Sequence, residues 1–396
     1  MKIDLGHSER QIMKGLKDFQ QATVERVFSL YKSGQNRVLV ADEVGLGKTL
    51  VAKGVIAKTA RYHKEELNDE LFKVVYICSN QNIANQNINK LKINREVTVD
   101  GVTDTRLSMQ HLKIFEKESD QNIKDKYIQL IPLTPSTSFS MTSGCGSVEE
   151  RALMFAILKR MPAFKDYIKE LEIILIDWAT SSWRWASTWY EKRVATCDKV
   201  SDGEYIETVQ KAINEYFNEK QINKELVTLC QKVRATGGNR IGSTYDTLYR
   251  LRMMFAQISV DLLKPDLVIM DEFQRFKFLI SADVSTETGI LADRFLRGNN
   301  IKILLLSATP YKLYSTLEEI NETQNDEHYS EFLQVINFLF ECPKEQQTFK
   351  EIWNNFSVNL RELSFDNLSI IEVKNSAENA MYKGVCRTER ISAIKS

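Results

Sequence analysis

The chain has 396 residues, with 53 basic and 53 acidic side chains, and 43% of its residues are hydrophobic. This ordinary globular composition excludes a disordered, collagen-like or low-complexity chain, and the length predicts two to three domains at roughly 150 residues each. A net charge of zero excludes a tail that coats nucleic acid through bulk charge, although a local basic groove is still allowed.

The outer parts of the chain predict strands that alternate with helices. A short β-branched run at residues 37–40 leads into a glycine-containing loop, and an apolar segment with helical periodicity follows at 50–60. Strand, glycine loop and helix form the opening of a βαβ unit. The runs that predict strands are 37–40, 74–78, 127–133, 267–270 and 301–306. Because these runs are apolar throughout, they predict a parallel sheet buried on both faces, in a doubly wound α/β domain.

The alternation stops between residues 140 and 259, which predicts a large helical insertion. Three tryptophans of this block, Trp178, Trp185 and Trp189, stand at positions i, i+7 and i+11, on one face of a helix. Two interpretations are open for this stripe. It is either part of a buried helical core, which the spacing favours, or a stacking platform for nucleic acid.

The predicted organisation therefore has four parts. Residues 1–139 and 260–317 form the two halves of the α/β domain, and residues 140–259 form the insertion between them. Residues 318–396 are mainly helical and contain no second glycine-rich loop. We expect this last part to lead toward a second domain of the same kind as the first.

Cysteine spacing and the amino terminus predict the compartment. The six cysteines are scattered without a C-x-x-C pair, so reduced thiols are favoured over a zinc site or a disulfide framework. The first ten residues are polar and lack the apolar core of a secretory signal. No apolar stretch reaches the roughly 18–20 residues of a membrane helix. The sequence therefore predicts a soluble, cytoplasmic protein.

The strongest functional motif is the glycine loop at residues 41–49, with the sequence ADEVGLGKT. Gly45 and Gly47 allow backbone N–H groups to turn inward around phosphates. Lys48 would then reach the β- and γ-phosphates of a nucleotide, and the Thr49 hydroxyl would hold Mg²⁺. Asp42 stands where the strict G-x-x-x-x-G-K-[ST] pattern has its first glycine.

Two adjacent carboxylates, Asp271 and Glu272, follow the apolar run 267–270. Adjacent acids are commonly solvated turns. At the carboxyl end of a buried strand, in a chain with a phosphate loop, they indicate a metal and catalytic site. We expect Asp271 to hold Mg²⁺ through water, and Glu272 to orient or deprotonate the water that attacks the nucleotide.

A third element, Ser307-Ala308-Thr309-Pro310, follows the last predicted strand. Together the three resemble the first RecA-like domain of superfamily 2 helicases and translocases. ADEVGLGKT resembles motif I in the form found in Swi/Snf-type remodelling ATPases, and the sequence DEFQ at 271–274 resembles motif II. The resemblance implies a P-loop NTPase of the RecA-like fold that uses ATP and Mg²⁺. The residues that it implies for nucleotide contact are Gln20, Gly45, Leu46, Gly47, Lys48, Thr49, Leu50 and Gln274.

The same resemblance implies roles for individual residues. Gln20 ends the sequence LKDFQ, which is similar to the segment whose glutamine reads adenine. Ser79 and Asn80 stand where motif Ia lies, and Thr134 opens a segment that resembles motif Ib, so all three are implied in contacts with the phosphates of nucleic acid. The residues implied in coupling nucleotide state to that binding are Ser307, Ala308 and Thr309.

The sequence departs from the family in two respects. About 220 residues separate Lys48 from Asp271, more than a RecA-like domain needs, and the helical insertion accounts for the excess. The 396 residues contain no Q-x-x-G-R-x-x-R pattern, which the family carries in its second RecA-like domain. Arg387 and Arg390 are the nearest candidates for its arginine finger, but an exposed helical pair is favoured. Because the finger strongly accelerates hydrolysis, this chain alone is expected to hydrolyse ATP slowly.

Two functions stay open. The first is the motor domain of a superfamily 2 DNA helicase or translocase, completed by a second RecA-like domain in the same or another chain. It would bind DNA, or RNA, through phosphate contacts. The second is an ATP-dependent binding switch or scaffold subunit of a nucleic-acid-processing or defence complex, with a protein partner at the insertion. The missing finger favours the switch, whereas Glu272 favours the motor. The four histidines are far apart in sequence and are expected to be surface or structural residues.

Overall fold

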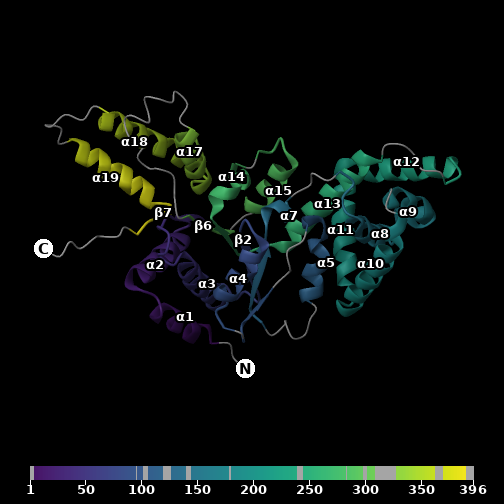
Figure 1. Ribbon diagram of the computed structural model, residues 1–396, viewed down its shortest axis with the longest axis horizontal. Helices are drawn as coiled ribbons and strands as arrows, with labels where there is room; N and C mark the ends of the chain where they lie inside the picture. The colour runs from purple at the N-terminus through teal and green to yellow at the C-terminus, as the bar shows by residue number, and fades with distance from the viewer. Residues whose placement is uncertain are drawn as a thin grey trace.

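A computed structural model describes residues 4–94, 96–100, 106–118, 126–139, 144–177, 180–238, 244–281, 283–297, 301–307, 327–361 and 369–388. A sheet of seven strands lies at the centre, and helices flank it on both sides (Figure 1). A lobe of helices lies to one side of the sheet, and the helices of residues 327–361 and 369–382 lie at the opposite end (Figure 1). No helix in the described ranges is long and apolar enough to cross a bilayer.

The sheet is parallel throughout, in the order β3-β4-β2-β5-β6-β1-β7. The strands are β1 (Arg37–Val40), β2 (Phe72–Ile77), β3 (Thr98–Asp100), β4 (Ile128–Leu133), β5 (Leu267–Asp271), β6 (Lys302–Leu306) and β7 (Val385–Cys386). The predicted α/β class with a parallel sheet is confirmed, and all five predicted strands are present close to their expected bounds. The sequence did not predict β3 and β7, because strands of three and two residues carry no periodic signal.

Four helices cover one face of the sheet. They are α1 (Leu5–Lys14), α2 (Asp18–Lys32), α3 (Lys48–Glu65) and α4 (Gln81–Leu91). Alternate side chains of each strand point to this face, so Val38 and Val40 of β1 pack with Val51 and Val55 of α3 in one hydrophobic cluster. The strands are apolar on both faces because each face is covered.

The opposite face carries the other set of alternate side chains, including Leu39 of β1 and Val75 of β2. The helices that contribute to this cluster are α5 (Leu107–Glu118), α13 (Tyr245–Leu263), α14 (Phe278–Ser281), α15 (Glu287–Leu296), α17 (Glu327–Leu339), α18 (Pro343–Arg361) and α19 (Ser369–Tyr382). Helices on both faces make a three-layer α/β domain.

The described part of residues 318–396, which we expected to lead toward a second domain, packs against the α/β domain. Phe332, Trp353 and Ala377, from α17, α18 and α19, lie in the same hydrophobic cluster as the sheet. The chain then returns to the sheet as β7, which pairs with β1 through Leu39–Val385 and Val40–Cys386. The described residues up to 388 therefore extend this domain, because their apolar side chains complete its core.

The helical lobe contains α8 (Val148–Leu158), the 3₁₀ helix η1 (Pro162–Tyr167), α9 (Ile168–Ile176), α10 (Thr180–Val200), α11 (Glu204–Lys220) and α12 (Ile222–Ala235). It has its own hydrophobic cluster. Two helices, α5 and α13, contribute to both the sheet cluster and the lobe cluster. On α13, Met253 and Val260 pack on the sheet side, whereas Phe255 and Ile258 pack on the lobe side. The structure gives no break at residue 259, where the predicted insertion ended, because the shared helix α13 runs through it.

A fully buried ion pair joins the lobe to α13. The side chains of Glu150 on α8 and Arg252 on α13 are both 0% exposed, and the Arg252 Nε lies 3.3 Å from the Glu150 Oε1. Ser108 donates its hydroxyl to the same carboxylate, and Arg106 pairs with it at 3.1 Å. Glu150 also forms a capping box with Ser147 at the start of α8. One acid therefore organises contacts from three segments.

The favoured interpretation of the tryptophan stripe is wrong for the two members that the structure describes. Trp185 is 62% exposed and Trp189 is 48% exposed, both on α10. The tryptophan that α10 buries is Trp183, whose indole N–H donates to Glu172 at 2.9 Å. The spacing of Trp185 and Trp189 places them on one face of α10, but it is the packing of neighbouring helices that determines which face of α10 is buried. Trp178 lies outside the described residues.

Candidate functional site

The phosphate loop and the acidic pair meet at one edge of the sheet. β1 and β5 flank the same strand, β6, with Val40 opposite Leu306 and Leu306 opposite Asp271. Two strand spacings separate β1 from β5, roughly 10 Å. The loop that follows β1 therefore lies at the same carboxyl edge as Asp271. Burial raises the pKa of Asp271, and the positive charge of Lys48 partly opposes that rise.

The loop has the backbone that its glycines predict. Gly45 and Gly47 have φ angles of 84° and 82°, a region that side chains other than glycine rarely adopt. Gly47 is the N-cap of α3, so the first N–H groups of that helix face the loop. Lys48 Nζ donates to the carbonyls of Asp42, at 3.1 Å, and Glu43, at 3.4 Å. These neutral partners leave the lysine charge available for an anion.

Gln20 stabilises the phosphate loop through hydrogen bonds of its side chain. Its side chain is buried, its Nε2 donates to the carbonyl of Leu46 at 2.8 Å, and its Oε1 accepts from the backbone N–H of Lys17 at 3.0 Å. A Cβ atom on Gly47 would lie 2.5 Å from the Gln20 Nε2. Gln20 therefore determines the loop's conformation in addition to any contact with a base.

The other residues of the loop and of the first turn of α3 differ in the exposure of their side chains. The Leu46 side chain is buried, so only its backbone faces the loop's interior. Thr49 is partly exposed, and Leu50 is exposed in the first turn of α3. Thr49 therefore leaves a hydroxyl accessible at the mouth of the loop.

Asp271 lies at the end of a chain of hydrogen bonds. The Tyr76 hydroxyl donates to Asp271 Oδ2, and the Asn87 side chain donates to the Tyr76 oxygen at 2.8 Å. Burial raises the pKa of Asp271, and the hydrogen bond from Tyr76 opposes that rise. Burial also raises the pKa of Tyr76, so its hydroxyl stays a donor.

Glu272 has a strained backbone. Its φ and ψ angles are 53° and 46°, a left-handed conformation that costs a residue with a Cβ atom about 1–3 kcal/mol. It starts the 3₁₀ helix η2 (Phe273–Phe276), and Gln274 of that helix donates to the Glu272 carboxylate. Among the described residues, Gln274 Oε1 is buried without a hydrogen-bond partner. Strain of this kind is typical of functional sites.

Asp42 gains a role that the motif did not predict. Its side chain is fully buried, and its Oδ1 accepts from the backbone N–H of Thr388 at 2.8 Å. Burial raises the pKa of this carboxyl, and the bond to Thr388 lowers it. The acid in the phosphate loop thus binds the segment that follows β7. No sequence pattern signals this contact, because the two residues are more than 300 positions apart.

The residues implied in nucleic-acid contact and coupling lie at the carboxyl edge of the sheet, but their side chains differ in exposure. Ser79 is partly exposed, and exposed Asn80 caps α4 by accepting from Asn82 N–H at 2.8 Å. The Thr134 side chain is buried at the start of the short helix α7 (Pro135–Ser138). The exposed residues of this segment are Ser136 and Thr137. Ser307 is buried after β6, and Ala308 and Thr309 lie outside the described residues.

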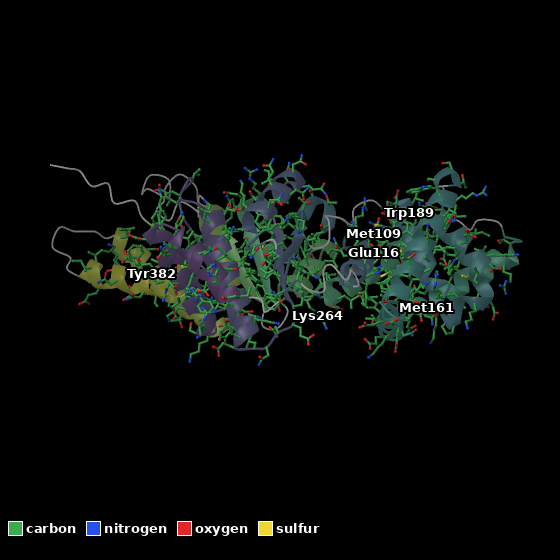
Figure 2. All side chains as sticks on the ribbon, turned by 90° about the horizontal axis from the view of Figure 1, so that it is seen from below. Met109, Glu116, Met161, Trp189, Lys264 and Tyr382 are labelled. Carbon is green, nitrogen blue, oxygen red and sulfur yellow. The ribbon has the colours of Figure 1, made fainter. Side chains whose placement is uncertain are left out.

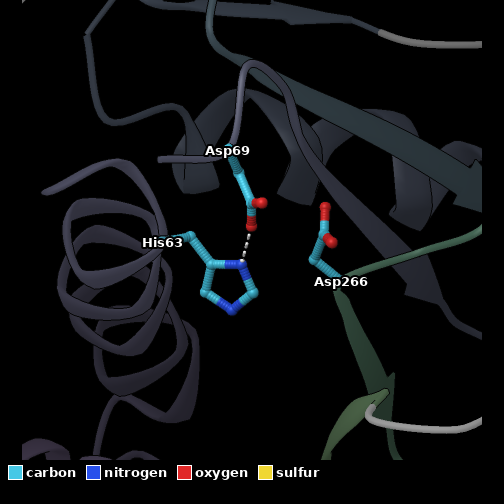
Figure 3. Close-up of side chains that lie close together, drawn as sticks. All are labelled: His63, Asp69 and Asp266. Carbon is cyan, nitrogen blue, oxygen red and sulfur yellow. Dashed lines mark hydrogen bonds and ion pairs between the residues drawn. The ribbon is translucent and has the colours of Figure 1, made fainter. Parts of the chain in front are cut away.

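A second polar cluster lies at the opposite edge of the sheet (Figure 3). His63, Asp69 and Asp266 have ligand atoms within 4.8 Å of one another, near the start of β2 and β5. His63 Nδ1 and Asp69 Oδ2 form a hydrogen bond of 2.6 Å, and Asp266 accepts from the backbone N–H of Lys73 at 2.7 Å. The first bond joins α3 to the loop before β2, and the second joins β2 to the residue before β5.

Comparison with known proteins agrees with the phosphate loop and the sheet. Residues 13–135 match the family model described as type III restriction enzyme, res subunit. No curated protein matches the chain. The matched range includes the phosphate loop and β1 to β4, and it ends before Asp271. The match and the parallel sheet together support a helicase-like ATPase domain of superfamily 2 in this chain.

Proposed function

We propose that this chain is the ATP-binding and hydrolysing motor domain of a cytoplasmic superfamily 2 DNA helicase or translocase. The observation that carries the proposal is the shared sheet edge of the phosphate loop and the acidic pair. The loop's glycine geometry and the partnerless oxygen of Gln274 fit a nucleotide with its metal ion. A second RecA-like domain, in this or another polypeptide, would complete the site.

Binding would use charge and backbone donors. ATP supplies the phosphoanhydride bond, and Mg²⁺ neutralises its phosphate charge. The N–H groups of Gly45, Leu46 and Gly47 would surround the phosphates, and Lys48 would exchange its two carbonyl partners for phosphate oxygens. Thr49 and Asp271 would hold the metal ion. Gln20 would fix the loop and contact the base.

Hydrolysis would depend on Glu272. Its left-handed backbone ends the extended conformation of β5, and the hydrogen bond from Gln274 orients its carboxylate. A carboxylate held in this way can position a water molecule and accept its proton. A finger from the second RecA-like domain would stabilise the transferred charge, so the domain alone should turn over slowly.

Nucleic acid would cross the carboxyl ends of the strands, where ligands bind in open α/β sheets. Ser79 and Asn80 would contact its phosphates there. Ser136 and Thr137 would take the contact first assigned to Thr134, because their side chains are exposed. The motif III residues Ser307, Ala308 and Thr309 would couple this contact to the nucleotide.

The test is the ATPase rate with and without nucleic acid, measured on the longest reading frame that contains this chain. We expect duplex or single-stranded DNA to raise the rate, and the gain to decrease with salt because the contacts are to phosphates. A rate that stays low with DNA and RNA, while ATP still binds, would reject the motor and support the ATP-dependent binding switch.

The acid side of the pH profile tests the role of Asp271. Its pKa is raised by burial, and Tyr76→Phe removes a hydrogen bond that stabilises the charged form. The pKa therefore rises further in the variant. Because only the ionised carboxylate holds Mg²⁺, we expect ATPase activity on acidification to be lost at a higher pH than in the wild type.

The matched control for this profile is Tyr127→Phe. Tyr127 is also buried, but its hydroxyl donates to the Ala60 carbonyl at 3.2 Å and does not contact Asp271. We expect its acid limb to coincide with that of the wild type. Equal pH profiles of ATPase activity for the wild type, Tyr76→Phe and Tyr127→Phe would show that Asp271 does not control the reaction through its charge.

A further inference from the structure

Two exposed tryptophans lie with their rings stacked on α10. Trp185 and Trp189 are one helical turn apart, and their rings are nearly parallel, with an interplanar angle of 8° and centroids 6.2 Å apart. Figure 2 shows Trp189 on the helical lobe, on the side that faces the sheet domain near Glu116. Exposed large aromatic side chains of this kind mark interaction sites.

The exposed charged residues of α10 are all positive. Arg184, Lys192 and Lys199 are exposed on α10. The two acids of α10 are less exposed and are engaged: Glu191 pairs with Arg160, and Asp198 accepts from the Ile206 N–H. We call the exposed set Arg184, Trp185, Trp189, Lys192 and Lys199 the tryptophan face. It is aromatic and basic, without an exposed acid.

A hollow of about 420 Å³ continues the tryptophan face toward α5. Trp189 and Lys192 line it from α10, and the ion pair between Arg193 and Glu116 lies in its wall. Its volume is in the range of ligand-binding pockets. The face therefore combines two exposed stacked rings, exposed cations and a recess.

We propose that the tryptophan face binds single-stranded nucleic acid, with bases stacked on Trp185 and Trp189 and phosphates on Arg184, Lys192 and Lys199. Stacked rings with flanking cations are the combination that sequence-independent single-strand binding uses. A duplex hides the faces of its bases, so it cannot stack on these rings. The inference rests on the proposed function for the choice of nucleic acid, and it adds the strand form that the lobe binds.

Other occupants fit less well. A second copy of this chain, docked face to face, would bring the cations of both copies together, which costs free energy. An acidic protein would satisfy the charges, but it does not require two parallel rings. Nucleic acid uses both features.

The experiment measures binding of fluorescein-labelled oligo(dT) of about 15 nucleotides to the full chain, without ATP, by anisotropy. We expect the double variant Trp185→Ala, Trp189→Ala to raise Kd at least about tenfold, because each stacked base contributes strongly to affinity. Trp185→Phe, Trp189→Phe keeps a stacking surface and should restore most of the affinity. Tyr382→Ala removes an equally exposed aromatic ring from α19 and should leave Kd unchanged.

The charge of the tryptophan face is tested in the same assay. Lys192→Glu should weaken oligo(dT) binding and reduce the slope of log Kd against log salt by roughly 0.7 or more. Lys232→Glu makes the same charge reversal at an exposed position on α12 and should have little effect. Equal effects of the two reversals would show that only the net charge of the lobe matters, which would overturn the proposal.

The outcomes separate this inference from the proposed function. DNA-stimulated ATPase activity with unchanged oligo(dT) binding in the alanine variant would overturn the inference and leave the motor intact. Loss of oligo(dT) binding in that variant, in a protein whose ATPase activity responds to no nucleic acid, would support the inference and reject the motor.

Discussion

Glu272→Gln is expected to reduce ATP turnover by about 10²–10⁴-fold while ATP still binds. The carboxylate is proposed to accept the proton of the attacking water, and an amide cannot do so. The substitution keeps the shape of the side chain, and a glutamine oxygen can still accept the hydrogen bond from Gln274. Binding of a fluorescent ATP analogue and single-turnover hydrolysis measure the two properties separately.

The matched control is Glu43→Gln, the same chemical change on the exposed part of the phosphate loop. We expect its turnover to stay within about twofold of the wild type, as for most surface substitutions. Normal hydrolysis by Glu272→Gln would show that another group activates the water. A loss of ATP binding in that variant would show that Glu272 acts on the structure of the site.

Arg252→Met is expected to destabilise the protein by about 3 kcal/mol or more. The side chain is fully buried, and its removal leaves the Glu150 carboxylate with less compensating charge in the interior. Arg106 still pairs with Glu150, which holds the loss near the lower end of the range for a broken buried pair. Urea unfolding followed by tryptophan fluorescence gives the free energy, because several tryptophans lie in the lobe.

The double variant Glu150→Gln, Arg252→Met tests the cause. It removes both charges and keeps the side-chain oxygen that caps α8, so we expect it to be more stable than Arg252→Met alone. Additive losses in the double variant would mean that the two residues do not interact. A loss below about 0.5 kcal/mol for Arg252→Met would show that the site is not effectively buried.

The phosphate loop and the strands are local features, and the sequence predicted them well. A left-handed glycine backbone, an apolar run and an acid at its end are all encoded within a few residues. The placement of the phosphate loop and Asp271 at one edge of the sheet required one further rule, that parallel strands end at a common edge. The strand order that makes β1 and β5 neighbours of β6 came from the structure.

The exposure of side chains, and contacts between residues distant in sequence, could not be predicted from local patterns. The periodicity of Trp185 and Trp189 is the same for a buried stripe as for an exposed one, and only the packing of α5 and α8 against α10 distinguishes them. Thr134 has a polar side chain that suits a phosphate contact, yet its fold environment buries it. Burial is decided by neighbours that are distant in sequence.

The sequence by itself determined the class of fold, the phosphate loop and the acidic pair, because backbone conformation and hydrophobic periodicity depend on residues close together in the chain. The tertiary structure decided which surfaces stay open and which distant residues meet: Asp42 with Thr388, Glu150 with Arg252, and the exposed rings of α10. These contacts depend on how the layers pack, and no local pattern specifies them.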